Sequence, residues 1–291
     1  MAFTRDDRIH SFTRIVSAGV ILVLLLAFLV LYVVPADTDK NFSWTIQPRT
    51  SAILIGAGYL AGGFFFSRLL GEKKWHRVQA GFLPITAFTI CMLAATLLHW
   101  DRFHLGTLAF YLWTIIYAVT PFLVPFIWWR NHATGTNELE KVDVQFSLPF
   151  RWGLGIFGIL GILSFLGLFA APTTLITLAP WKLTELTARV FSGWSILTFA
   201  TVVTISMDGR WSAARILIES AMVGLGLTLV GLPRMWNDFD PAKPMTYIFV
   251  GGIIFTLVVF IILHVWLDKS SHTKQRMVIA GSGGENLPKI P

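Results

Sequence analysis

Long apolar runs separated by short polar segments dominate the pattern of this chain. A helix needs roughly 20 apolar residues to cross about 30 Å of hydrocarbon, and eight stretches reach or approach that length. They lack the alternation over about ten residues that marks a strand of a membrane β-barrel. The pattern therefore predicts eight membrane-spanning helices, over residues 15–34, 51–67, 80–98, 107–129, 152–171, 190–206, 216–232 and 245–267.

Composition excludes a soluble protein. Charged residues make up 13% of the 291 and hydrophobic residues 55%, whereas a soluble domain carries about 25% charged residues. We therefore expect an all-α polytopic protein of the plasma membrane, in contact with the lipid bilayer. The single cysteine, Cys91, excludes an intrachain disulfide. In a soluble chain the net charge of +7 would suggest nucleic-acid binding, but here we expect no nucleic-acid partner, because positive loops orient membrane helices.

The positive residues are distributed unevenly between the two sides of the predicted helices. The N-terminus, the loops after the second, fourth and sixth spans and the C-terminal tail hold 16 of the 23 lysines and arginines, and the other four loops hold 7. Because cytoplasmic loops carry the excess of positive charge, we expect both termini in the cytoplasm. The first span follows basic residues as a signal peptide would, but we expect it to be retained because it has a counterpart later in the chain.

The chain aligns with itself at a shift of 137 residues, which becomes 136 in the later part of each half. Chance alignment of two apolar chains does not readily explain the matched Arg, Pro and Trp residues. Four spans per half give both halves the same direction, so an axis along the membrane normal should relate them. We therefore predict an internal repeat of two parallel four-helix units. The matched pairs are Arg14 with Arg151, Pro35 with Pro172, Trp44 with Trp181, Trp75 with Trp211, and Trp100 with Trp236.

The repeat sets the expected domain boundaries. Residues 1–130 should form the first four-helix membrane unit and residues 148–268 the second. The polar segment 131–147 between them is expected to be a cytoplasmic linker. Residues 269–291 are polar, with glycines and prolines, and cannot bury enough apolar surface to fold. We expect a disordered cytoplasmic tail there.

Sequence motifs for catalysis and cofactor binding are weak. The glycines of residues 153–158 match a dinucleotide-binding pattern, but that pattern needs a preceding strand and a later acidic residue. We instead expect a ridge of small residues that lets another helix approach closely. His99, Asp101 and His104 have no zinc-motif spacing, and no two histidines are placed to hold a haem within the bilayer. We therefore expect no cofactor and no metal, and an enzyme is the least favoured class.

Glu219 is the one formal charge inside a predicted span, and an intramembrane carboxylate is a candidate functional residue. It lies about one turn from the cytoplasmic end of its span, four residues after Arg215. A pair at this spacing would let both side chains reach the interface. Two interpretations follow: a structural ion pair, or a residue that binds a proton or a ligand.

Aromatic and charged residues recur in the loops on the side opposite the termini. One interpretation is a duplicated interfacial belt, since Trp prefers the headgroup region and Asp can close helix ends. The other is a pair of half-sites that close over a groove shared by the two units, where aromatic faces and carboxylates would suit a cationic or amphipathic ligand. With Glu219, the candidate ligand-binding residues are Trp44, Trp100, Asp101, Arg102, Trp181, Trp236 and Asp238.

The parallel units, the Trp, Pro and Thr residues at helix entries and the W-x-x-F outer loops resemble uncharacterised bacterial multi-pass membrane proteins, a resemblance that implies no activity. The leading hypothesis is a carrier or binding protein for a small or lipid-like molecule, at an outward-facing groove between the repeats. One alternative is a non-catalytic scaffold or accessory subunit with a membrane-protein partner. The other is an intramembrane enzyme acting on lipid or quinone. A carrier should contain a polar-lined cavity between the units, whereas a scaffold should have a filled centre and an exposed glycine-rich stripe.

Overall fold

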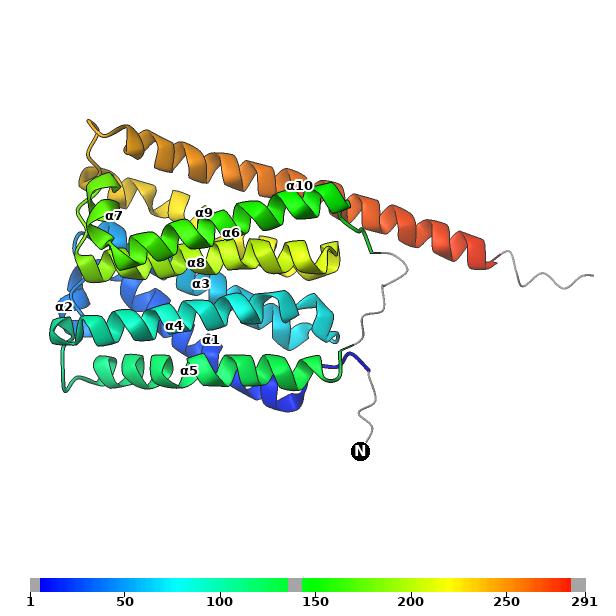
Figure 1. Ribbon diagram of the computed structural model, residues 1–291, viewed down its shortest axis with the longest axis horizontal. Helices are drawn as coiled ribbons and strands as arrows, with labels where there is room; N and C mark the ends of the chain where they lie inside the picture. Colours follow the sequence, from blue (N-terminus) through cyan, green and yellow to red (C-terminus); the bar gives the residue numbers. More distant parts are fainter. Residues whose placement is uncertain (1–5, 136–142, 284–291) are drawn as a thin grey trace, which may run out of the picture.

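The computed structural model describes residues 6–135 and 143–283, which form a bundle of long helices lying side by side (Figure 1). Eight helices in these residues are long and apolar enough to cross a membrane, as the sequence predicts, so the chain is compatible with a polytopic membrane protein. The described residues contain no strand, only two isolated bridges. The long helices are α1 (Ser11–Phe28, continued by a π-helical turn over Leu29–Val33), α3 (Arg49–Gly71), α4 (Phe82–Leu98), α5 (Leu108–His132), α6 (Leu148–Ala170), α8 (Glu185–Asp208), α9 (Trp211–Met235) and α10 (Pro244–Gly283).

Two short helices, α2 (Thr38–Asn41) and α7 (Pro172–Leu178), lie at one end of the bundle, which we call the α2–α7 end (Figure 1). Both described ends of the chain lie at the opposite end, which we call the terminal end. This placement follows from an even number of helices that alternate in direction. We refer to residues 6–135 as the first half and to residues 143–283 as the second half.

Helix boundaries differ from the predicted spans where charged or polar residues continue a helix. Helix α9 begins at Trp211, before the predicted span, and its added first turn includes Arg215, which pairs with Glu219 on the same helix. Helix α10 continues to Gly283, so residues 269–283 of the expected disordered tail are helical. No proline interrupts that stretch, so nothing forces the helix to stop. The rest of the expected tail, and the part of the expected linker between residues 135 and 143, lie outside the described residues.

Two arginines at matching positions close the C-terminal ends of α3 and α8. Arg14 donates hydrogen bonds to the carbonyl oxygens of Leu70 and Glu72. Arg151 donates from Nε to Ser206 O at 2.8 Å. The last carbonyl groups of a helix lack intrahelical donors, and a cation near them is also favoured by the helix dipole. Each arginine therefore ties the first long helix of its half to the second.

Helices from the two halves are interleaved. Helix α3 packs against α1 of its own half and α9 of the other half, and α8 packs against α6 of its own half and α4 of the other half. Helices α4 and α5 form a further pair, as do α9 and α10. The second long helix of each half therefore contacts the third long helix of the other, in both directions. The centre of the bundle is built by both halves together.

The glycine series on α6 packs closely against α8, as the sequence predicts. A Cβ atom on Gly158 would lie 2.6 Å from Val203 Cγ2 and 3.0 Å from Phe199 O. A Cβ atom on Gly161 would lie 2.1 Å from Phe199 Cδ1. Gly153, on the same helix, has no such neighbour within 4 Å. The small residues thus serve close helix packing.

We predict that Gly158→Leu lowers the thermal unfolding midpoint of the purified protein, because overpacking of a close contact costs about 1–3 kcal/mol. The matched control is Gly153→Leu, where the added side chain enters open space, and its midpoint should stay near that of the wild type. Equal losses in the two variants would contradict the packing shown here.

Candidate functional site

Trp44 lies in a closed aromatic cluster at the α2–α7 end. Its ring centroid is 5.4 Å from that of Phe103 and 4.7 Å from that of Trp113 on α5. A backbone hydrogen bond of 2.8 Å from His104 N to Ser43 O holds the two loops together beside it. Only 2% of Trp44 is exposed. The faces of this indole are therefore covered by protein, and it contributes to the core of the first half.

Trp181 occupies the same kind of cluster in the second half. Its ring centroid is 5.6 Å from that of Phe239 and 5.2 Å from that of Phe249 on α10, and 7% of the residue is exposed. Its Nε1 donates to Ser51 Oγ of α3 at 2.9 Å. The hydrogen bond crosses from the second half to the first, so Trp181 links the two halves as well as filling a core.

Asp238 caps a helix of the other half. Its Oδ2 accepts hydrogen bonds from Thr50 N at 3.0 Å and from Thr50 Oγ1 at 2.7 Å. Thr50 lies in the first turn of α3, where backbone N–H groups have no intrahelical acceptor and a carboxylate is favoured by the helix dipole. The carboxylate that the sequence offers as a ligand group is therefore engaged in the contact between the end of α9 and α3.

The remaining candidates at this end lie at the surface, on the 3₁₀ turns Trp100–Arg102 and Trp236–Asp238. Trp100 is 42% exposed and Trp236 is 49% exposed. Asp101 and Arg102 pair with each other at 3.2 Å, and both side chains are largely exposed, so the pair contributes little to stability. Of the aromatic candidates at this end, these two indoles are the ones whose surfaces remain open to headgroups or to a ligand.

His99 makes a contact that the sequence does not predict. Arg189 Nη1 lies 2.6 Å from His99 Nε2, and Arg189 Nε donates to Phe169 O at 3.1 Å. Because arginine does not give up its proton, His99 Nε2 is the acceptor and the imidazole is neutral. Burial, together with the charge of the Arg189 guanidinium, lowers the pKa of His99. This contact joins the end of α4 to α8 and is another link between the halves.

The two histidines of the 99–104 segment do not converge. His104 lies 3.0 Å from Phe42 O through Nδ1 and 3.1 Å from Thr45 Oγ1 through Nε2, whereas His99 faces Arg189. Within residues 6–135 and 143–283, no group of three or more His, Cys, Asp or Glu side chains is placed to hold a metal ion.

Glu219 forms the ion pair predicted from its spacing to Arg215, with 3.1 Å between Arg215 Nε and Glu219 Oε1. Its Oε2 also lies 3.4 Å from Arg68 Nη2 of α3. His264 and Asp268 of α10 complete the group. The Glu219 side chain is 11% exposed and lies between three helices near the terminal end, remote from the other candidates. The pair with Arg215 could be predicted because both lie on one helix, but the other partners come from elsewhere in the chain.

Large side chains fill the space between the halves. Trp194 of α8 lies against Gly58 of α3, where a Cβ atom would be 2.8 Å from the indole Cη2. The Trp194 ring centroid is 4.6 Å from that of Phe88 on α4 and 5.5 Å from that of Tyr59 on α3. The hydroxyl oxygens of Tyr59 and Tyr117 are 3.0 Å apart in the same buried region. Aromatic rings therefore occupy the place where a central cavity is expected for a carrier.

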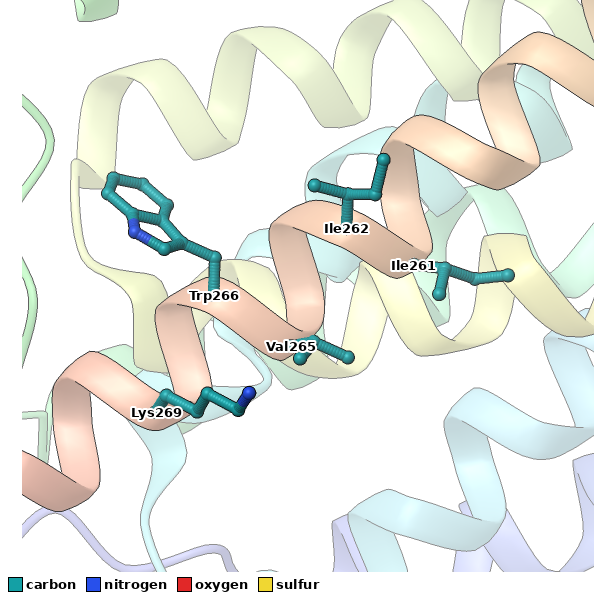
Figure 2. Close-up of a pocket in the computed structure, with 5 residues that line it drawn as sticks. All are labelled: Ile261, Ile262, Val265, Trp266 and Lys269. Carbon is teal, nitrogen blue, oxygen red and sulfur yellow. The ribbon is translucent and has the colours of Figure 1, made fainter.

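A shallow depression lies at the surface on α10 (Figure 2). All of its lining residues come from this one helix, so it does not lie between the halves. Its lining is apolar apart from a Trp and a Lys near the end of the span, where such residues lie at headgroup depth. The lining residues are Ile261, Ile262, Val265, Trp266 and Lys269.

No protein-family model, no curated protein and no solved structure matches this chain. Function is therefore inferred from the chain's own contacts. The structure engages half of the eight candidate residues internally and leaves the other half at the surface. The engaged residues are Trp44, Trp181, Asp238 and Glu219, and the surface residues are Trp100, Asp101, Arg102 and Trp236.

We predict that Asp238→Ala destabilises the protein by about 1 kcal/mol, the usual effect of removing a helix cap, because Thr50 N loses its acceptor. Asp101→Ala is the matched control, since Asp101 occupies the corresponding turn and pairs only with its exposed neighbour in the described residues. Thermal or denaturant unfolding of both variants measures the difference. A loss in Asp101→Ala as large as that in Asp238→Ala would contradict the capping role.

Proposed function

We propose that this protein is a non-catalytic scaffold or accessory subunit of a larger membrane complex. The observation that carries the proposal is the filled centre, in which aromatic side chains of α3, α4, α5 and α8 occupy the space between the halves. A carrier needs a concave site with convergent polar groups, and the interior holds closely packed aromatic rings at that place. The outer surface of the bundle is then the part available for function.

The outer surface that suits a partner lies on α6 and α10. Only 6% of the apolar stretch of each of these helices is buried, compared with 50% in α3. Gly251 and Gly252 of α10 have no atom within 4 Å of a Cβ position. Small residues let a second backbone approach closely in a bilayer, so a transmembrane helix of another protein fits this face.

We also propose that the bundle consists of two copies of one four-helix unit. Support comes from the exchange of contacts between α3 and α9 and between α8 and α4, and from hydrogen bonds that recur at the sequence shift of 136 or 137. These include contacts made before the first helix of each half, which the sequence comparison does not reach. The matched bonds are Trp75 N to Asp7 O and Trp211 N to Val144 O, and His104 N to Ser43 O and Asp240 N to Pro180 O.

A carrier or binding protein is the second candidate. The observation in its favour is that Trp100 and Trp236 are both exposed at the α2–α7 end, where indole faces could hold an amphipathic or cationic molecule. The buried positions of Trp44 and Trp181 leave fewer groups for such a site. An enzyme acting on lipid or quinone has less support, because the titratable groups near Glu219 are already paired with one another.

Orientation supplies the first test of this arrangement. We propose that the terminal end faces the cytoplasm, because 16 of the 23 lysines and arginines lie on its side of the spans. A reporter that is active only in the cytoplasm should give signal when fused at Asp268 and none when fused at Asp37. The reverse pattern would place the α2–α7 end in the cytoplasm.

The scaffold itself is tested by site-specific photo-crosslinking of the full chain in its native membrane. A photoreactive residue at Gly252 on α10 should yield a discrete adduct with another membrane protein. The control position is Leu22 on α1, which is 71% exposed and should capture lipid only. Lipid adducts at both positions, with a small-molecule adduct at Trp236, would favour the carrier and contradict the scaffold.

A further inference from the structure

Five ionisable side chains from three helices meet near the terminal end, and we call them the charge cluster: Arg68 of α3, Arg215 and Glu219 of α9, and His264 and Asp268 of α10. Arg215 bridges the two carboxylates, with Nε 3.1 Å from Glu219 Oε1 and Nη2 2.8 Å from Asp268 Oδ2. Two guanidinium groups balance two carboxylates. The cluster is therefore electrically neutral when the imidazole is neutral.

His264 faces the same two carboxylate oxygens that Arg215 bridges. Its Nε2 lies 3.5 Å from Asp268 Oδ2 and 4.0 Å from Glu219 Oε1. A nitrogen that faces two carboxylates is best occupied by a hydrogen atom, since a lone pair there would be repelled. In the neutral ring the other nitrogen, Nδ1, then carries the lone pair. The tautomer of His264 is thus set by its neighbours.

Two acceptor atoms of the charge cluster are buried without a hydrogen-bond donor in the described residues. They are His264 Nδ1 and Glu219 Oε2, although Arg68 Nη2 remains within ion-pair distance of the latter. Leaving a buried acceptor unsatisfied costs free energy. A proton added at Nδ1 would give the ring a positive charge, which would lie close to both carboxylates.

The bundle does not need the charge cluster in order to pack. On the proposed duplication, the positions that correspond to Arg215, Glu219, His264 and Asp268 in the first half are Gln79, Leu83, Trp128 and His132. There Trp128 and His132 simply stack, with ring centroids 4.6 Å apart. That stack lies within α5, and Gln79 Nε2 donates to Asp208 Oδ2 of α8 at 3.0 Å. These four positions of the first half therefore carry no carboxylate of their own. Ionisable groups inside a membrane span are costly to place and generally serve a function.

We propose that the charge cluster is a proton-binding site, with His264 as the group that takes up the proton. Hydronium on the terminal side transfers a proton to Nδ1: its O–H bond breaks as the N–H bond forms, water is released, and the imidazole becomes an imidazolium. The groups that face it are Glu219 and Arg215 from α9 and Asp268 from α10, while Arg68 of α3 reaches it through Glu219. The imidazolium attracts both Glu219 of α9 and Asp268 of α10. Because Glu219 lies on the other helix, protonation tightens the packing of α10 on α9.

The experiment uses the full chain in detergent micelles and compares wild type with His264→Gln. On acidification from pH 7.5 to 5.5, the thermal midpoint of the wild type should rise relative to that of His264→Gln by about 2–4 °C, the shift that a gain of one favourable contact produces in a protein of this size class. His132→Gln is the control, because His132 is a histidine of the first half whose ring stacks on Trp128, and it should respond as the wild type does.

Nitrogen NMR of histidine-labelled protein provides a readout that a purely structural role would not move. The ring signals lost in His264→Gln should shift to the imidazolium form on acidification of the wild type. In Glu219→Gln the same signals should need more acid to shift, because one neighbouring negative charge is gone. If His264→Gln does not fold, Glu219→Gln and Asp268→Asn identify the signal instead. Midpoints that change in parallel in wild type and His264→Gln, or an imidazole that stays neutral at pH 5.5, would overturn the proposal.

Discussion

Packing between the two halves, of α3 on α9 and of α8 on α4, is the interaction on which the rest of the structure depends. In a bilayer, burial of apolar surface between helices gains little, because lipid tails are equally apolar, and close packing and interhelical hydrogen bonds must hold helices together. This chain uses both. Trp194 fits against Gly58 in the centre, and Asp238 caps the first turn of α3 at one end. Because these contacts cross between the halves, they also close the centre.

The sequence could predict the features that depend on one helix at a time. Hydropathy located all eight helices, though not the extension of α10 to Gly283, because crossing hydrocarbon imposes one length and one composition on every span. The i,i+4 spacing identified the pair of Arg215 and Glu219, and the glycine series at 153–158 identified a packing ridge on α6. Arg215 and Glu219 lie on the same helix, and the glycines recur at a regular spacing along one helix. Neither feature requires knowledge of the neighbouring helices.

The sequence could not predict the partners that come from different helices. His99 and Arg189 are far apart in the chain and neither belongs to a motif, yet they meet at 2.6 Å and couple α4 to α8. From the sequence, Asp238 could be either a ligand-binding group or a helix cap. The position of Thr50 in the structure shows that it is a helix cap. Burial likewise decides which tryptophans can contact a ligand. Trp44 is covered by protein and Trp100 is exposed, although both lie in loops of similar composition.

The tryptophans that the proposed duplication pairs differ in their polar contacts. Trp181 Nε1 and Trp211 Nε1 each donate to a side chain of another helix. The Nε1 atoms of Trp44 and Trp75 are buried with no hydrogen-bond partner among the described residues. An unpaired buried donor costs about 1–3 kcal/mol, and both indoles are 2% exposed or less, so apolar contacts must offset that cost. Apolar packing is therefore common to the halves, whereas the polar partners differ. The acceptor of Trp211 is Asp268, a carboxylate of the charge cluster. The difference in polar partners between the halves therefore coincides with the ionisable groups proposed to bind a proton.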